Sequence, residues 1–246
     1  ANQLSTFKKE REFDFSFSIP GVSRFRVNAY HQRGNIAIAF RIIPSHIKGF
    51  KELNLPAVVR DLCKLNSGFV VCTGPTGSGK STTLAAMVDS INRSRKCHII
   101  TLEDPIEYLH QHQESIIHQR EIGSDSYSFA KALRVALRQD PDVILVGEMR
   151  DLETIATAIE AAETGHLVMT TLHTNDAAQA VERIIDVFPP HQQTQIRIQL
   201  AAVFEGVIAH QLIPRRDKQG RVLATEALVA TGAGRPSKLE EAQWAK

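Results

Sequence analysis

The chain has little net charge, few cysteines and no long apolar run, and each shortage narrows what the protein can be. Its 29 lysines and arginines are nearly balanced by 27 aspartates and glutamates, so no broad cationic field favours nucleic acid or anionic lipid as the main partner. No apolar run approaches the roughly 18 residues of a membrane-spanning helix, and the first residues are polar rather than signal-like. We therefore expect a cytoplasmic protein that binds no nucleic acid and has no transmembrane segment.

The three cysteines lack the C-x-x-C spacing of redox and zinc sites, and two of them lie in apolar runs. They are expected to be buried free thiols of a reducing compartment. Three of the ten histidines lie close together, at 110, 112 and 118, but no cysteine or acidic residue beside them has ligand spacing. We expect no metal at these histidines.

The patterning changes near residue 56, which divides the chain into two parts. Residues 1–48 read as strands, with alternation over 14–19, 25–30 and 36–42. Such strands need something to pack on, so we expect the last part of a small α/β domain whose beginning is absent. Residues 49–56 are expected to be a linker, and residues 233–246 a polar tail, either a linker or an addition to the natural chain.

Residues 57–232 alternate between helical patterns and short apolar runs. That alternation predicts an α/β fold with a mostly parallel sheet covered on both faces, the core of a P-loop NTPase. The expected strands are 69–73, 97–102, 143–146 and 167–172. The expected helices are 56–65, 81–92, 127–139, 152–163, 176–186 and 191–208, followed by a hairpin over 210–229.

A complete G-x-x-x-x-G-K-[ST] phosphate loop follows the first of these strands. Its glycines let the backbone bend so that N–H groups point at phosphate oxygens. Lys80 would reach the β- and γ-phosphates, and the Ser81 hydroxyl would ligate Mg²⁺. A glycine-rich turn that binds nothing is the alternative, which the correct flanking strand and helix disfavour. We assign ATP binding to Gly74, Pro75, Thr76, Gly77, Ser78, Gly79, Lys80, Ser81 and Thr82.

Acidic residues and a histidine follow three neighbouring strands, where ligands of such sheets gather. Glu148 follows an apolar strand as a second acidic (Walker B) residue and would hold the water shell of Mg²⁺ or orient the attacking water. Glu103, Asp104 and Glu107 offer a second anchor, and His173 is placed to touch the γ-phosphate. The alternatives are a helix-capping role for Glu148 and a solvated helix-start carboxylate for Glu107.

Arginines could complete the charge balance of a phosphate site. Four of them on the N-terminal strands suggest arginine fingers, from the same chain or a neighbour. Solvated charge on edge strands is the alternative. Two further arginines lie four residues apart on one helix, where phosphate contact and a solvated basic face are both open. The six are Arg24, Arg26, Arg33, Arg41, Arg134 and Arg138.

With these residues assembled, the chain resembles the bacterial secretion ATPase superfamily and, within it, the type IV pilus retraction (twitching motility, PilT-type) ATPases. The likeness covers residues of about 13 to 230, and it rests on long motifs in a fixed order. They are Arg24-Phe25-Arg26-Val27-Asn28, the loop from Gly74 to Leu84, the "Asp box" from Glu103 to Tyr108, Gln119 to Gly123, Asp140 to Asp151, and the "His box" from Glu163 to His166 and from His173 to Asn175.

The resemblance implies a homohexameric ring in which ATP lies between a PAS-like N-terminal domain and a RecA-like domain. It implies Mg²⁺-dependent ATP hydrolysis that drives pilus retraction through an inner-membrane platform protein, at the cytoplasmic side of that membrane and alongside other pilus ATPases. The family's catalytic glutamates match Glu107 and Glu148, and its histidine matches His173. Its two phosphate-reaching arginines match Arg26 and Arg41.

Two departures from the family bear on function. The four-cysteine zinc insertion of extension-type relatives has no counterpart here, which favours retraction. The C-terminal Ala-Ile-Arg-Asn-Leu-Ile-Arg-Glu-like motif of retraction ATPases is also missing after Ala230-Thr231, so we expect a fragment. The alternatives are a pilus-extension or type II secretion ATPase, a nucleic-acid-translocating ATPase, and a subunit that binds ATP without hydrolysing it.

Overall fold

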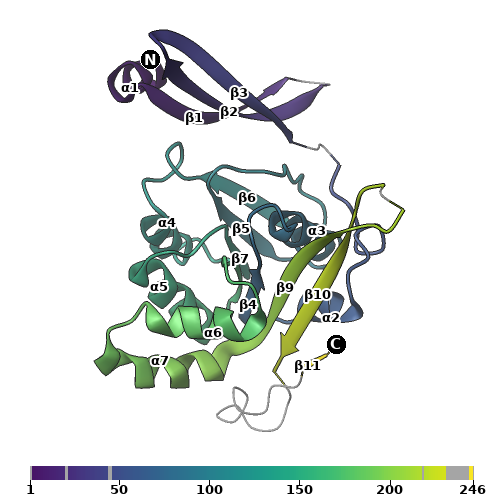
Figure 1. The fold of residues 1–246 in the computed structure, drawn as a ribbon. Coiled ribbons are helices and arrows are strands. Elements are labelled where there is room, and N and C mark those ends of the chain that lie inside the picture. The colour runs from purple at the N-terminus through teal and green to yellow at the C-terminus, as the bar shows by residue number, and fades with distance from the viewer. Residues whose placement is uncertain (1, 20–21, 44–45, 218, 231–243, 246) are drawn as a thin grey trace. The chain divides into compact units, whose positions relative to one another are not determined.

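The structure is a computed structural model that describes residues 2–19, 22–43, 46–217, 219–230 and 244–245 (Figure 1). The chain forms two compact units. The first comprises Ala1–Ile47 and the short segment Pro105–Leu109, and the second comprises Lys48–Asp104 and His110–Lys246. No helix among the described residues is long and apolar enough to cross a membrane.

The first unit contains one helix and a three-stranded antiparallel sheet in the order β1-β2-β3. Its elements are α1 (Asn2–Glu10), β1 (Glu12–Ile19), β2 (Ser23–Gln32) and β3 (Asn35–Ile43). The β2–β3 turn has both central residues at positive φ, Arg33 at 48° and Gly34 at 80°, which is the backbone of a tight hairpin. Our prediction that residues 1–48 are all strands was wrong for α1, where polar residues and good helix formers replace the alternation.

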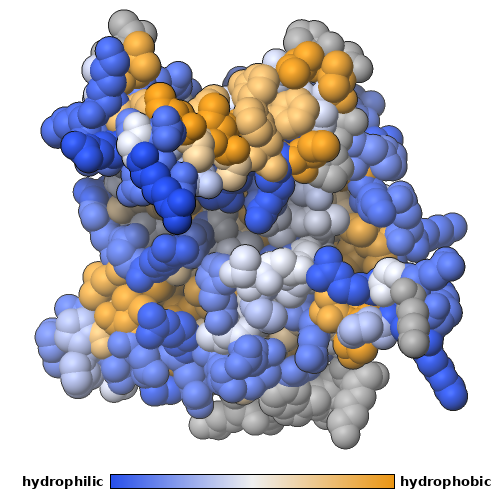
Figure 2. All heavy atoms as spheres, turned by 45° about the horizontal axis from the view of Figure 1, so that its top comes forward, coloured by the Kyte–Doolittle hydropathy of each residue, from blue (hydrophilic) through white to orange (hydrophobic). Residues whose placement is uncertain are grey.

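The sheet of the first unit has one apolar face. Alternation puts Phe15 and Phe17 of β1 on the same side as Phe25 of β2, and Phe17 stacks on Phe25 with ring centroids 5.3 Å apart. Much of this face is exposed, and it forms the orange patch at the top of Figure 2. Exposed patches of this kind mark surfaces that contact another segment or molecule. The exposed members are Phe17, Ile19, Ile36, Ile38, Phe40 and Ile42.

The second unit is built on an eight-stranded sheet in the order β11-β10-β9-β4-β8-β7-β5-β6. All pairs from β9 to β6 are parallel, whereas β10 pairs antiparallel with both β9 and β11. The predicted α/β fold with a mostly parallel sheet is confirmed. The strands are β4 (Gly68–Thr73), β5 (His98–Glu103), β6 (Ile116–Glu121), β7 (Val143–Val146), β8 (Leu167–Thr171), β9 (Phe204–Pro214), β10 (Arg221–Val229) and β11 (Trp244–Ala245).

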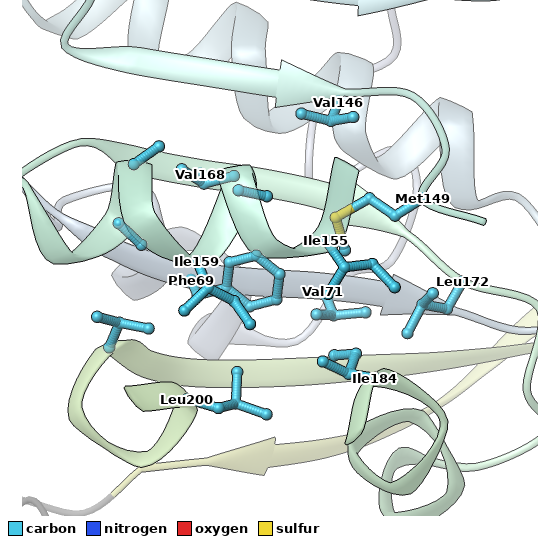
Figure 3. Close-up of a cluster of buried hydrophobic side chains, with 14 of the residues drawn as sticks. Phe69, Val71, Val146, Met149, Ile155, Ile159, Val168, Leu172, Ile184 and Leu200 are labelled. Atoms are coloured by element: carbon cyan, nitrogen blue, oxygen red, sulfur yellow. The ribbon is translucent and has the colours of Figure 1, made fainter. Parts of the chain in front are cut away.

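Helices cover both faces of this sheet, and the central strand β4 is buried between two clusters of apolar side chains. Phe69 and Val71 pack on the side of α5 and α7, where Ile155, Ile159 and Leu200 meet them (Figure 3). The alternate residues of β4 pack against α3 on the other side, which explains the continuous apolar run of this strand. The helices are α2 (Ala57–Leu62), α3 (Lys80–Ser94), α4 (Phe129–Ala136), α5 (Leu152–Glu163), α6 (Ala177–Asp186) and α7 (Pro190–Val203).

The end of the last helix differs from the prediction. The helix expected over 191–208 stops at Val203, and the chain continues as β9 from Phe204, so the closing hairpin begins earlier than expected. Gly206 explains why tertiary packing overrides the helical pattern. A Cβ at this position would lie 3.0 Å from the Leu228 carbonyl oxygen of β10, so β9 and β10 need its close backbone approach.

Strand β6 was not predicted at all. It lies at the edge of the sheet and is half polar, so it lacks the apolar run of the central strands. The edge is partly covered, because the Ile117 N–H donates to His112 Nδ1 at 3.0 Å. Of the predicted tail over 233–246, residues 233–243 and 246 lie outside the described residues, and 244–245 form β11.

Candidate active site

The phosphate loop connects the buried strand β4 to the start of α3. Gly74, Gly77 and Gly79 all have positive φ, at 140°, 77° and 99°. Gly74 is required for space as well as conformation, since a Cβ there would lie 2.5 Å from the His210 carbonyl oxygen. The loop therefore has the sharply bent backbone that the sequence predicts for a phosphate cradle.

Lys80 opens α3 and is 7% exposed. Its Nζ donates to the carbonyl oxygens of Gly74 at 2.7 Å and Pro75 at 3.1 Å. The same Nζ lies 3.5 Å from His173 Nδ1. The ammonium group thus rests on the loop's own carbonyls, at the place from which it would contact a bound phosphate.

Glu148 and His173 meet just beyond two adjacent strands. Glu148 Oε1 lies 3.3 Å from His173 Nε2, and it also forms an ion pair with Arg150. His173 therefore has Lys80 at one ring nitrogen and Glu148 at the other. These contacts favour a neutral ring that accepts from Lys80 at Nδ1 and donates to the carboxylate from Nε2.

Burial is the main cause that lowers the pKa of His173 below its ordinary value. The charges of Lys80 and Arg150 lower this pKa further, whereas the Glu148 carboxylate raises it. The net direction is downward, so His173 is predominantly neutral at neutral pH. A neutral imidazole can relay hydrogen bonding between the cation and the carboxylate without adding charge.

Backbone and threonine contacts fix the strand ends that carry these groups. The Gly147 N–H donates to the Leu102 carbonyl at 2.7 Å, and Thr171 Oγ1 donates to the Gly147 carbonyl at 2.6 Å. Thr73 Oγ1 donates to the Thr174 carbonyl at 2.9 Å. Three strand ends and the phosphate loop are therefore joined along one edge, which holds the backbone from which Lys80, Glu148 and His173 project.

Glu103, at the end of β5, is held by two side-chain donors. Thr101 Oγ1 donates to its Oε1 at 2.7 Å, and Gln119 Nε2 donates to the same oxygen at 3.2 Å. Gln119 also accepts from the His110 N–H at 2.8 Å. This carboxylate is oriented by the edge strand β6, which gives the unpredicted strand a part in shaping the site.

The remaining predicted residues belong to the first unit. Glu107 lies in the segment Pro105–Leu109, and the two arginines lie on neighbouring strands. Arg26 and Arg41 are direct cross-strand partners, so two positive charges occupy one pair of positions on the sheet. Like charges opposite each other are unfavourable, and a bound anion would relieve the repulsion. Arg24 instead donates from Nε to the Ile106 carbonyl at 3.3 Å.

Several histidines and one further arginine serve local structure. His98 Nε2 and His118 Nδ1 are hydrogen-bonded at 2.8 Å, and His166 Nδ1 lies 2.8 Å from the Ala161 carbonyl oxygen. Among the described residues, no group of three or more His, Cys, Asp or Glu side chains could hold a metal ion. Arg134 forms an ion pair with Glu153 of α5.

Sequence reasoning missed His210, which lies on β9 beside the phosphate loop and is 1% exposed. It also gave no role to Arg150, which pairs with Glu148. A histidine directly after the apolar residues Val207 to Ala209 was the available signal. It could not be interpreted, because the pairing of β9 with β4 was not predicted.

Known proteins share much of this sequence and fold. A family model described as "Type II/IV secretion system protein" matches residues 25–242. The chain is 50% identical to a twitching motility protein of Neisseria gonorrhoeae over 95% of its length, and 48% identical to the type IV pilus retraction ATPase PilT of Pseudomonas aeruginosa over 94%. It spans 63% and 67% of those two relatives. A crystal structure of the pilus retraction motor PilT with bound ADP matches 97% of the chain, with a TM-score of 0.93 and 52% sequence identity. The chain covers 69% of that protein.

The pKa of His173 offers a test of the contacts around it. Glu148→Gln removes the charge that raises this pKa, so we expect the pKa to fall further. Arg150→Gln removes a charge that lowers it, so we expect a rise. The ring protons of His173, followed by NMR over pH 4 to 8 (roughly the range in which histidines titrate), report both. A shift in the same direction in the two variants would contradict the arrangement.

Proposed function

The chain belongs to the Type II/IV secretion system protein family, and we propose that it is the ATP-hydrolysing subunit of a motor that retracts type IV pili. The observation that carries the proposal is the contact of Lys80 and Glu148 with opposite sides of His173, beside a complete phosphate loop. Similarity over 95% and 94% of the chain to proteins named for twitching motility and pilus retraction supports the direction of the motor.

The residues present fit a nucleotide and its metal. Positive-φ glycines free the backbone N–H groups of the loop, and the N-terminus of α3 adds a partial positive charge for phosphate. The hydroxyl of Ser81 and the carboxylate of Glu148 are the oxygen donors that Mg²⁺ prefers, directly or through water. Mg²⁺, when bound with ATP, would neutralise charge on the phosphate oxygens.

Each residue then has a distinct part in hydrolysis. Lys80 exchanges the carbonyls of Gly74 and Pro75 for the β- and γ-phosphates. Glu148 orients the attacking water. His173 links that carboxylate to Lys80, so that the position of the lysine and the orientation of the water are coupled. Water adds to the γ-phosphorus, the bond to the β-phosphate oxygen breaks, and ADP and phosphate leave. We assign Glu103 and Glu107 to a second carboxylate anchor, which would lie near the same Mg²⁺.

We further propose that the subunits work as a homohexameric ring. In this proposal residues 1–48 are part of a PAS-like domain, residues 49–56 a linker and residues 57–232 a RecA-like domain. Arg26 and Arg41 of one subunit reach the phosphates held by a neighbour, which satisfies the paired positive charges of β2 and β3. Hydrolysis moves the domains, and the ring passes this motion to a platform protein at the cytoplasmic side of the inner membrane.

Binding and hydrolysis are expected to separate in two variants. Lys80→Ala removes the phosphate contact, so nucleotide binding should be lost. Glu148→Gln keeps the loop, so ATP should still bind, while turnover falls about 100-fold or more because the water is no longer oriented. Fluorescent nucleotide titration and phosphate release measure the two effects. Unchanged hydrolysis in Glu148→Gln would remove this residue from the mechanism.

Mixing inactive variants tests whether the arginines act between subunits. An Arg26→Gln/Arg41→Gln double variant retains an intact loop, and Lys80→Ala retains intact arginines. If the arginines act on a neighbour, mixed rings regain some functional interfaces, and ATPase activity should appear on mixing. Lys80→Ala mixed with Glu148→Gln is the control, since both defects lie on the loop side. Absence of recovery beyond that control would place the arginines on their own subunit's nucleotide.

The direction of the motor requires an assay in cells. The protein that carries this chain should restore twitching motility to a retraction-deficient strain, and its Glu148→Gln form should not. Twitching zones and surface pilus counts are measured together, because a retraction defect leaves pili present but immobile. Rescue of an extension-deficient strain instead would identify the chain with the extension or secretion ATPases.

A further inference from the structure

His210 lies directly behind the phosphate loop without serving any contact described so far. β9 pairs in parallel with β4, and Ala209 is the partner of Thr73, so His210 stands beside the first residue of the loop. The side chain is 1% exposed. Neither ring nitrogen has a hydrogen-bond partner among the residues that the structure describes. Buried polar groups are nearly always paired, so an imidazole kept in this state calls for a functional reason.

The approach of His210 to the loop is close. A Cβ on Gly74 would lie 2.5 Å from the His210 carbonyl oxygen and 3.3 Å from its Cβ. The same Cβ would lie 2.7 Å from Ser78 Oγ, which is also buried and has no partner within the described parts of the chain. Two unsatisfied polar side chains therefore flank the residue whose carbonyl accepts from Lys80.

The neutral charge state of His210 is compatible with its position near Lys80. Burial, and then the nearby charge of Lys80, lower its pKa to about 4. At neutral pH the ring therefore carries one N–H donor and one acceptor, and no charge. A neutral donor can stand next to Lys80 without the repulsion that a second lysine or an arginine would cause.

We propose that His210 is a positioning residue that takes over a loop carbonyl when Lys80 turns to the nucleotide. The inference rests on the proposed function, in which Lys80 must leave Gly74 and Pro75 to reach phosphate. That movement would strip the buried carbonyl of Gly74, and the partly exposed carbonyl of Pro75, of a charged donor. The N–H of His210 replaces it, so the loop keeps its shape while its lysine is engaged. The empty and occupied loops then differ by an exchange of donors.

Measurements of ATP affinity on three variants test this exchange of donors. His210→Leu removes the donor and should weaken ATP binding about 5- to 10-fold, the effect of one neutral hydrogen bond, with little change in kcat. His210→Gln supplies an amide donor and should stay within about 2-fold of the wild type. His110→Leu is the matched control, because its Nδ1 is also buried without a partner among the described residues and its pKa is also lowered to about 4, yet it lies in the loop before β6. It should leave affinity unchanged.

A spectroscopic readout keeps the test independent of folding. The ring N–H of His210 in the wild-type chain should move downfield in NMR spectra when ATP with a non-hydrolysable γ-phosphate is added, since it gains an acceptor. An unmoved signal, or equal affinity of His210→Leu and the wild type, overturns the proposal. A loss of affinity in Ser78→Ala but not in His210→Leu also overturns it and gives the role to Ser78. Failure of the wild type to bind ATP refutes the proposed function instead.

Discussion

The parallel pairing of β4 with β8 on one side and β9 on the other is the constraint on which the rest of the second unit depends. Parallel strands bring their carboxyl ends to one edge, so the phosphate loop and His173 follow their strands there together. His210, within β9, lies level with the end of β4. The pairing is stabilised by burial on both faces, with Phe69 and Val71 packed on one side and Val70 and Cys72 on the other. The apolar packing of β4 therefore positions the residues of the site, although these apolar side chains do not themselves belong to the site.

Around that edge, Lys80, Glu148 and His173 each have a charged or polar partner. Lys80 rests on carbonyl oxygens, Glu148 pairs with Arg150, and the neutral ring of His173 lies between cation and carboxylate. A charged histidine here would repel Lys80, and partial desolvation of the ring and the charge of Lys80 both lower its pKa. Desolvation and the neighbouring cations therefore act in the same direction, and both favour the neutral ring that its contacts require.

Much of this could be predicted from the sequence because the signals were local. The loop motif, the four apolar strands and the acidic residue after Val146 each depend on a few adjacent positions, and the structure places them as expected. The failures were non-local. The strand that begins at Phe204 follows a helical pattern and exists because β4 and β10 pair with it, while β6 is too polar to be recognised outside the sheet. His210 was missed for the same reason, since Gly74, its neighbour in space, lies 136 positions earlier in the chain.

The resting position of Lys80 has a consequence for a machine that works in cycles. Because the ammonium group has carbonyl partners of its own, departure of a product does not leave a bare buried cation behind. An idle subunit can therefore keep its loop folded between turnovers. In the proposed ring, some members could stand empty while others work, and each would remain ready to bind nucleotide without refolding its site.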